Sequence, residues 1–335
     1  MSTRPPVRPV VWAAPAVPPR ARERSGPERL APVRRIELGG IGPEDVVVDA
    51  AGRLLTGIAD GRILRVTLDD GQVETLANTG GRPLGLEPLT DGRLIVCDAE
   101  RGLLRVDPQG GGDVEVLVAD IDGRPLRFCS NAAAAPDGTV YFSASSQRFG
   151  LEHYRGDLIE HSGTGRLFRR APDGEVSVLL EGLQFANGVA LSADGGYLVV
   201  AETGGYQLRR LWLTGPRAGT DDVLVANLPG FPDNISRGPS GLIWVALASP
   251  RNAQLDWLHR RQPILRRILW SMPESLQPRP LRTMWVVGVD DEGAIVRDLQ
   301  ATGAGFHFVT GVVEHAGRLY LGSLAGSAIA ELALP

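Results

Sequence analysis

The stretch FANGVALSADGGYLVVAETGGY (185–206) carries the pattern that decides the fold. One apolar run leads into a Ser-Ala-Asp-Gly-Gly turn, and a second apolar run leads out of it. Glycine after Asp, Ser or Ala supplies the positive φ that a tight hairpin turn needs. The stretch therefore predicts a β-hairpin, with Asn187 near the start of its first strand and Glu202 near the end of its second.

The same unit of strand, turn and strand recurs along most of the chain. Its turn glycines are Gly52, Gly92, Gly138, Gly196, Gly241 and Gly317, and the gaps between them are 40, 46, 58, 45 and 76 residues. A β repeat of about 40–50 residues is typical of propeller blades, each a four-stranded sheet that cannot bury its faces alone. We therefore predict an all-β fold, a six-bladed β-propeller in which residues 33–38 complete the last blade.

Two segments fall outside the repeat. Residues 1–32 are rich in Pro and Arg and lack periodicity, which predicts a disordered or loosely packed arm before a single propeller domain at 33–335. The widest gap between turns holds a helical insertion at about 250–282. We expect this insertion to lie over one face of the propeller.

The insertion has a helical apolar pattern over 252–272 that Pro263 should divide. Its apolar positions at helical spacing are Leu255, Leu258, Leu265, Ile268 and Leu269, and the arginines mostly opposite them are Arg260, Arg261, Arg266 and Arg267. We interpret the segment as a lid or packing helix. The alternative is a basic amphipathic helix in peripheral contact with a membrane.

Composition and charge exclude several classes of protein. The chain has 335 residues, 43% of them hydrophobic, and no apolar run approaches the ~18 residues of a membrane span. No secretory signal is recognised, so a cytoplasmic location is expected. All 35 basic residues are arginines; residues 1–35 carry +6, residues 250–282 carry +5, and the rest carry −15. An acidic body disfavours nucleic-acid binding and suits a protein that holds a cation.

Polar residues recur at one height on the wall of the predicted channel. Seven to nine residues before the turn glycine, four of the six blades carry a carboxylate or carboxamide: Glu44, Asn131, Asn187, Asp233 and Asn234. Each alone is typical of a structural turn residue, but oxygens that converge on one axis need a counter-ion. The set lacks His and Cys, and amide and carboxylate oxygens in an irregular cage favour Ca²⁺. The sequence therefore predicts one axial calcium site.

Several of these stretches resemble a known superfamily. GPEDVVVD (42–49), residues 185–206 and FPDNISRGPSGLIWVALASP (231–250) look like the calcium-dependent six-bladed propellers, which include the paraoxonases, the senescence-marker/gluconolactonase group and the strictosidine-synthase-like proteins. FCSNAAAAPDGTVYFSASSQRF (128–149) followed by TGRLFRR is most similar to the strictosidine-synthase-like branch. In paraoxonase-like members the matching residues bind one catalytic calcium. The resemblance implies that role for the five residues above.

The resemblance also implies a reaction: calcium-dependent hydrolysis of small-molecule lactones or esters, in which Ca²⁺ polarises the carbonyl oxygen for attack by water. Candidates for the base are Asp98, where paraoxonases carry a histidine, and His307, just before the last inner strand. Two alternatives stay open: a strictosidine-synthase-type enzyme that forms a C–N bond, and a non-catalytic binding propeller with structural calcium. The glutamate that the synthase uses falls here on Val309 or Thr310, and we interpret Glu314 as structural. A small-molecule substrate and a monomeric chain are expected.

Overall fold

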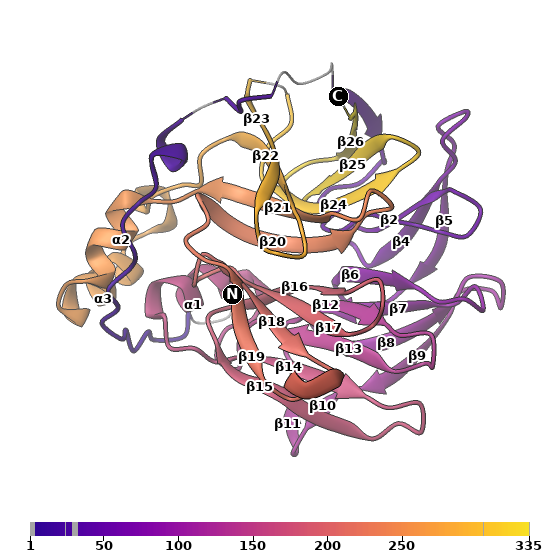
Figure 1. Ribbon diagram of the computed structural model, residues 1–335, viewed down its shortest axis with the longest axis horizontal. Helices are drawn as coiled ribbons and strands as arrows, with labels where there is room; N and C mark the ends of the chain where they lie inside the picture. Colours follow the sequence, from indigo (N-terminus) through magenta and orange to yellow (C-terminus); the bar gives the residue numbers. More distant parts are fainter. Residues whose placement is uncertain (1–3, 24, 29–32, 304, 335) are drawn as a thin grey trace.

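The structure, a computed structural model, describes residues 4–23, 25–28, 33–303 and 305–334. Its main body is six four-stranded antiparallel sheets (Figure 1). The first three blades are β2 (Val47–Val48), β3 (Leu54–Gly57), β4 (Arg62–Val66) and β5 (Val73–Asn78); β6 (Pro83–Pro88), β7 (Leu94–Asp98), β8 (Gly102–Asp107) and β9 (Asp113–Val118); and β12 (Cys129–Ala134), β13 (Val140–Ala144), β14 (Gly165–Arg170) and β15 (Val176–Leu183). The next two are β16 (Ala186–Leu191), β17 (Tyr197–Glu202), β18 (Gln207–Trp212) and β19 (Asp221–Val225), then β20 (Gly230–Arg237), β21 (Ile243–Pro250), β22 (Thr283–Val289) and β23 (Ile295–Thr302). The predicted all-β propeller is therefore confirmed.

The sixth blade joins the two ends of the propeller. It consists of β24 (Val309–His315), β25 (Arg318–Ser323), β26 (Ala328–Ala333) and β1 (Arg34–Glu37). Strand β1 pairs antiparallel with β26, so that Arg34 lies opposite Glu331. This confirms that residues 33–38 complete the last blade. A small hairpin of β10 (Asp120–Ile121) and β11 (Arg124–Pro125) lies outside the blades.

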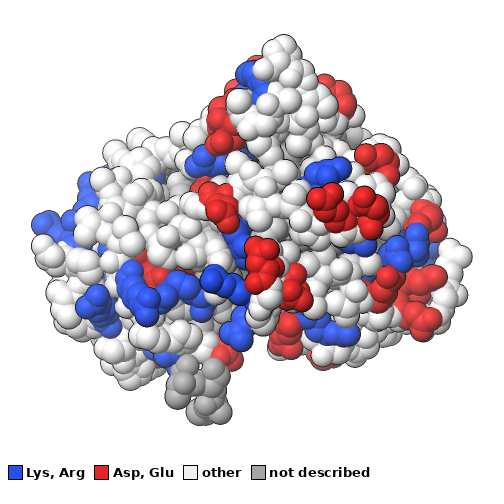
Figure 2. Space-filling model, turned by 90° about the horizontal axis from the view of Figure 1, so that it is seen from below, with Lys and Arg blue, Asp and Glu red and all other residues white. Residues whose placement is uncertain are grey.

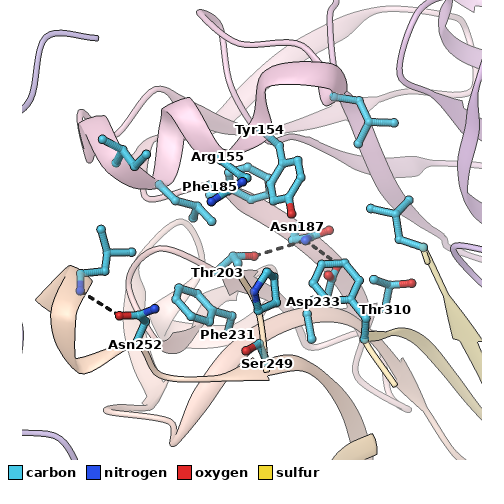
Figure 3. A pocket seen from close by; sticks show the side chains of 18 of the residues that line it. Tyr154, Arg155, Phe185, Asn187, Thr203, Phe231, Asp233, Ser249, Asn252 and Thr310 are labelled. Carbon is cyan, nitrogen blue, oxygen red and sulfur yellow. Dashed lines mark hydrogen bonds between the residues drawn. The ribbon is translucent and has the colours of Figure 1, made fainter. Parts of the chain in front are cut away.

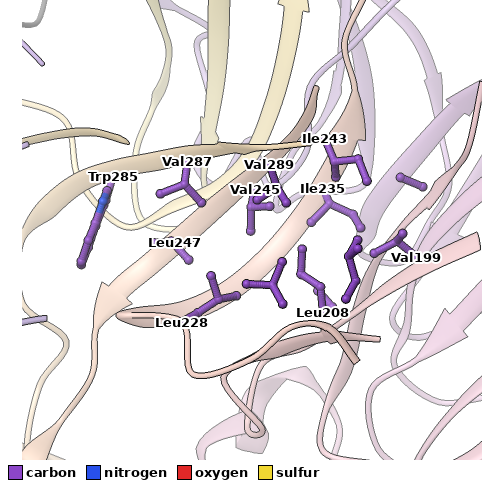
Figure 4. Close-up of a cluster of buried hydrophobic side chains, with 14 of the residues drawn as sticks. Val199, Leu208, Leu228, Ile235, Ile243, Val245, Leu247, Trp285, Val287 and Val289 are labelled. Atoms are coloured by element: carbon purple, nitrogen blue, oxygen red, sulfur yellow. The ribbon is translucent and has the colours of Figure 1, made fainter. Parts of the chain in front are cut away.

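The hydrophobic core lies between neighbouring blades. The cluster in Figure 4 joins the fourth and fifth blades and includes Leu208, Ile235, Val245 and Trp285, all nearly or fully buried. Five further clusters in the described part of the chain join the other adjacent pairs in the same way. Because each sheet covers the faces of two neighbours, a ring lets every blade bury apolar surface that it could not bury alone.

The turns of the hairpins agree with the repeat, with one exception. Five of the six predicted turn glycines have positive φ, for example 78° at Gly52 and 84° at Gly241. In the fourth blade it is Gly195, with φ of 68°, that takes this conformation, and the prediction for Gly196 is wrong. The Asp-Gly-Gly turn offers two glycines, and the sequence does not say which one turns.

A layer of helices covers one end of the strands (Figure 1). It contains α1 (Tyr154–Glu160), α2 (Ala253–His259) and α3 (Pro263–Ser271), with short 3-10 turns at η1 (Pro19–Arg22), η2 (Leu151–His153), η3 (Gly215–Arg217) and η4 (Glu274–Leu276) elsewhere in the chain. The insertion leaves β21 and returns at β22, and Pro263 is the first residue of α3, both as predicted. Helix α1, in the 58-residue gap between the turns at Gly138 and Gly196, was not predicted. Among the described residues, no helix has the length and apolar character that crossing a membrane requires.

The N-terminal arm runs along this layer (Figure 1). The Val10 amide donates to the carbonyl of Glu160 at 2.9 Å, and the Trp12 amide donates to the carbonyl of His259 at 3.0 Å. The Trp12 ring stacks on His161, with 3.9 Å between ring centroids. We call residues 4–23 together with α1, α2 and α3 the helical layer. The composition of the arm did not indicate these contacts.

The orientation expected for the insertion is partly wrong. Leu265 and Ile268 of α3 are exposed to 37% and 54%, whereas Arg266 between them is fully buried. Arg266 is buried because its guanidinium donates to the carbonyl of Ile159 at 2.9 Å and to that of Val10 at 2.7 Å. The last carbonyls of a helix lack partners within that helix, so a cation at the end of α1 supplies both hydrogen bonds and charge.

Candidate functional site

A cavity of about 140 Å³ lies between the helical layer and the ring of inner strands. Figure 3 shows its lining side chains converging from several blades and from α1. Its walls are mainly apolar and include Leu84, Phe128, Phe185, Phe231, Leu258 and Phe308. Its polar side is formed by Glu44, Asn187, Asp233 and Thr310. The arrangement is an apolar chamber with a small polar surface near the propeller axis.

Irregular backbone in the inner strands places these polar side chains. The pairing of β16 with β17 shifts register between Ala186 and Val189, and that of β20 with β21 shifts between Pro232 and Ile235. Asn187, Asp233 and Asn234 lie inside these shifts. A β-bulge re-aims a side chain out of the ordinary alternation. The same shift brackets Asn131 in β12. The bulges therefore explain why the polar residues of the third, fourth and fifth blades leave the ordinary alternation of their strands, whereas Glu44 lies before β2, whose pairing with β3 has no such shift.

Hydrogen bonds join most of the predicted metal ligands in pairs. The Asn234 amide donates to both carboxylate oxygens of Glu44, each at 3.1 Å. The Asn187 amide donates to Asp233 Oδ1 at 2.6 Å, a bond drawn in Figure 3. Asn131 instead donates to Asp45 at 3.2 Å. The structure thus pairs Glu44 with Asn234 and Asn187 with Asp233, while Asn131 pairs with an acid that sequence reasoning did not include.

These bonds correct one step of the sequence argument. Converging oxygens were expected to require a counter-ion, but each asparagine also carries an NH₂ donor that satisfies a carboxylate. One acceptor stays without a partner: the buried Asn234 Oδ1 makes no hydrogen bond. An amide turned about its last torsion exchanges oxygen for nitrogen at nearly the same place. The asparagine side chains of the site can therefore either donate hydrogen bonds to its carboxylates or, with the amide turned, direct their oxygens to a cation.

The carboxylates of the site lie in an environment that disfavours negative charge. Burial raises the pKa of Asp233 to about 8, and that of Asp45 to about 7. Burial, with further contributions from Asp233 and Asp45, raises the pKa of Glu44 well above its usual value. The nearby Arg82 guanidinium acts on Glu44 in the opposite direction. A bound cation would remove this cost, since it favours the charged form of each acid.

The donor set fits calcium. Two carboxylates and three amides offer only hard oxygen ligands, which Ca²⁺ prefers in irregular geometry. Among the described residues, no three acidic, histidine or cysteine side chains group closely enough to hold a metal by themselves. The asparagine oxygens would therefore have to complete the coordination. The orphaned oxygen of Asn234 is the atom in the structure that supports this fit most directly.

Sequence reasoning missed the aromatic walls. Phe128, Phe185 and Phe308 have left-handed backbones, with φ of 54°, 61° and 56°. This conformation is uncommon for a bulky residue and tends to mark functional sites. The signal that was available is the position of these phenylalanines, two or three residues before Asn131, Asn187 and Thr310.

Tyr154 of α1 was also missed. Figure 3 shows its hydroxyl pointing toward Asn187. Burial raises the pKa of this tyrosine, and the Asp233 carboxylate raises it further. The tyrosine is therefore a neutral hydroxyl over the polar side of the cavity.

The two candidate bases occupy different environments. Asp98 is fully buried and is absent from the cavity lining. Its Oδ1 accepts from the amides of Arg82, Glu100 and Arg101 at 2.9–3.0 Å, the contacts of a turn residue. His307, which is also absent from the cavity lining, is half-buried next to Phe308, which does line it, and burial together with Arg282 lowers the pKa of His307.

The sixth blade has no acid on its inner strand at the height of the site. Thr310 lies there, and its hydroxyl donates to the backbone carbonyl of Glu44 at 2.7 Å. Glu314 accepts from the Trp244 indole at 2.7 Å and from the Ser240 hydroxyl. These are structural contacts, as predicted for Glu314.

Comparison with known proteins agrees with the fold and with the family resemblance. The family models for strictosidine synthase and for the N-terminal part of strictosidine synthase-like proteins match residues 132–216 and 27–66. The chain is 36% identical to the adipocyte plasma membrane-associated protein of Mus musculus over 318 residues, covering 88% of this chain and 75% of that protein. It is 34% identical to strictosidine synthase-like protein 10 of Arabidopsis thaliana, covering 85% and 83%.

Solved structures share the fold at low sequence identity. A gluconolactonase from Xanthomonas campestris superposes with a TM-score of 0.66 at 16% identity, covering 99% of this chain and 95% of that one. The calcium-binding protein regucalcin from Agrobacterium tumefaciens gives 0.63 at 16% identity, covering 91% and 94%. These likenesses show the propeller architecture.

Proposed function

The chain belongs to the strictosidine synthase-like family of six-bladed propellers, and on that premise we propose that it is a calcium-dependent hydrolase of small-molecule lactones or esters. Gluconolactonases and regucalcin among its structural neighbours support a lactonase-type propeller. The observation that carries the proposal is the pair of buried acids, Glu44 and Asp233, each bonded to an asparagine at the polar side of an apolar cavity.

The proposed cation site uses all five predicted ligands: Glu44, Asn131, Asn187, Asp233 and Asn234. When bound, calcium would supply Lewis-acid chemistry, polarising a carbonyl oxygen and favouring the charge that grows on it in the transition state. Burial first, and the proximity of Asp233 next, raise the pKa of Glu44, and this is the electrostatic reason to expect a cation there.

The rest of the cavity binds and orients the substrate. The phenyl rings of Phe128, Phe185 and Phe231 form a wall for the apolar part of an ester and exclude water from it. The Tyr154 hydroxyl faces the polar side, where it can donate a hydrogen bond to an ester oxygen. Of the two candidate proton acceptors we favour His307, because Asp98 is fully buried away from the cavity and its Oδ1 accepts three backbone amides.

Synthase chemistry has less support. A base on the last inner strand would be required, and Thr310 there donates its hydroxyl to a backbone carbonyl. A binding propeller with structural calcium differs from the hydrolase only in turnover. The test must therefore separate calcium binding from catalysis.

The test is a thermal melt with EDTA and with added Ca²⁺, run beside hydrolysis of a phenyl ester and a γ-lactone. At 100 times its Kd, a ligand that binds only the folded state stabilises by about 2.7 kcal/mol. We expect calcium to raise the Tm and to be required for turnover, and Asp233→Asn to lose both effects. Asp91→Asn, on an exposed outer turn, is the matched control and should keep both.

The outcomes distinguish the alternatives. Calcium-dependent stability without turnover of either substrate would contradict the hydrolase and favour a binding role. Turnover that persists in EDTA would contradict the role of the metal. A Tm unmoved by calcium in the unmodified protein would overturn the metal site itself.

A further inference from the structure

The outer surface of the insertion combines exposed apolar side chains with arginines that form no salt bridge among the described residues, although Arg260 donates to the carbonyl of Ala14 and Arg261 stacks on Trp257. In α3, Ile264 is 53% exposed and Ile268, one turn later, is 54% exposed. Trp257 of α2 is 50% exposed. Leu276 and Leu281, in the segment that returns to the propeller, are exposed to 64% and 44%. Elsewhere in the described part of the chain, large apolar residues are exposed singly or as the adjacent pairs Val10–Val11 and Ile295–Val296, whereas the segment from α2 to Leu281 contributes six.

The side chains of α2 and α3 divide into two sets. Leu255, Leu258 and Leu269 line the cavity, so they form the inner side of the layer. Ile264, Leu265 and Ile268 point away from it and remain exposed. Apolar residues on the inner side are explained by packing over the cavity. Those on the outer side are left partly exposed, a state that packing over the cavity does not explain.

Positive charge surrounds these outward apolar residues. Within 252–282 the exposed cations outside the cavity lining are Arg260, Arg261, Arg267 and Arg282, whereas the exposed Arg279 lines the cavity. The two acids in this segment are Asp256, which is buried and paired with Arg251 at 2.9 Å, and Glu274, which pairs with Arg4 at 3.2 Å. The outer surface of the insertion therefore carries several cations and no unpaired acid among the described residues.

The remainder of the molecule has the opposite charge. Figure 2 shows arginines gathered on the side of the helices, and acidic side chains mostly toward the other side. Outside residues 1–35 and 250–282 the chain carries −15. An anionic surface would attract the helical layer and repel the body, which fixes the orientation of approach.

We propose that the outer surface of α2, α3 and the segment through Leu281 docks on an anionic lipid surface. Trp257, Ile264 and Ile268 would enter the boundary between headgroups and acyl chains, and the arginines would contact lipid phosphates. Charge complementarity favours anionic lipid over a second copy of this chain, whose corresponding surface would be equally positive. Docking would bring the cavity, which the inner side of the same helices lines, close to the lipid.

The proposal is tested by co-sedimentation with phosphatidylcholine vesicles, with and without phosphatidylserine. We expect binding to vesicles that contain phosphatidylserine, weaker binding to phosphatidylcholine alone, and loss of binding at high salt. Ile264→Ser with Ile268→Ser should reduce the partition coefficient by about tenfold or more, given the apolar area removed. Arg261→Gln with Arg267→Gln should reduce it by a similar factor on anionic vesicles, since each cation near such a surface contributes about 1 kcal/mol.

Matched controls separate docking from general effects. Val116→Ser with Val178→Ser makes the same kind of change at exposed positions on outer strands, and should leave binding unchanged. Arg93→Gln with Arg105→Gln removes two cations that pair with Asp91 and Glu115, and should also leave it unchanged. Each variant replaces exposed side chains, so an unchanged Tm checks that it is folded.

Three results would overturn the proposal. The first is no sedimentation with either vesicle. The second is sedimentation that the Ile264→Ser/Ile268→Ser variant retains. The third is a concentration-dependent dimer that this variant abolishes, which would assign the surface to a second copy of the chain. None of these readouts depends on hydrolysis, so the proposed enzyme activity stands or falls separately.

Discussion

The propeller body buries its apolar side chains between blades, whereas the helical layer leaves several of its apolar side chains exposed. In the body, inward residues such as Leu208 and Val245 are fully buried between two blades. In the layer, Ile268 is half exposed while its neighbour Arg266 is fully buried. In the repeat, the apolar face of each blade packs against the next blade, which carries the same sequence pattern. A single insertion has no such partner in its own sequence, so contacts with distant segments decide which side of the helix is buried.

Arginine 266 illustrates this dependence. Helical periodicity placed it on the solvent side together with Arg267. Its guanidinium instead binds the carbonyls of Ile159 and Val10, which belong to α1 and to the arm. The sequence distance to these partners exceeds 100 residues. Hydrogen bonding to free carbonyls outweighed the local apolar pattern, because unsatisfied buried groups cost about 1–3 kcal/mol each.

The two regions should differ most in the loss of stability that follows truncation of an apolar side chain to alanine. Leu208→Ala, in the core between the fourth and fifth blades, should lower the free energy of unfolding by about 2–5 kcal/mol. Ile268→Ala in the layer should change it by less than about 0.5 kcal/mol, because half of that side chain is already in water. Urea unfolding of both variants measures the difference. Equal losses would show that Ile268 is buried in solution and that the two regions do not differ.

A smaller difference between the two regions is expected when the pH is lowered, which should destabilise the helical layer more than the blades. His161 stacks on Trp12 of the arm and lies near His259 of α2 and Arg266 of α3. Burial first, and then charge interactions with His259 and Arg266, lower the pKa of His161 to about 3. Burial, with a further contribution from Arg266, lowers the pKa of His259 to about 4, although its ring bonds the carbonyl of Leu158. Both histidines are therefore neutral when folded and bind a proton near pH 6.5 once released.

The sign follows from that difference. A lowered folded pKa means that the released state binds more protons, so stability is full above about pH 6.5 and falls as the pH drops toward 3–4. At pH 5.5 each histidine should cost the layer about 1.4 kcal/mol. Hydrogen exchange at pH 5.5 and 7.5, corrected for intrinsic rates, should show opening of residues 4–16 and of α1 before the blades. The variant His161→Phe, which keeps the stack and cannot titrate, should open less, and opening that matches the unmodified protein would contradict the assignment.

The sequence predicted the propeller body better than it predicted the helical layer. The six blades, the closing strand and the inward polar residues all follow from the repeat, because each copy repeats the same physical requirement. The pairing of Asn131 with Asp45 did not follow, since the acid adjacent to Glu44 was not weighed as a partner. Helix α1, which contributes Tyr154 to the cavity wall, could not be predicted from the repeat either, because its seven residues lie within a segment without a clear helical pattern.

The smallest expected effect concerns the one turn that the repeat misassigned. Gly195 has φ of 68°, and a Cβ there would meet no atom within 4 Å, so substitution by alanine costs only the left-handed backbone, about 1 kcal/mol. Gly196 does not have positive φ, and a Cβ there would meet only the Asp194 carboxylate of the same turn, 3.0 Å away, which a shift of a few tenths of an ångström would accommodate. Gly195→Ala should therefore lower the Tm measurably, whereas Gly196→Ala should leave it nearly unchanged. The reverse order would mean that the fourth hairpin turns at the glycine that the repeat first indicated, and that the body is more regular than the structure describes.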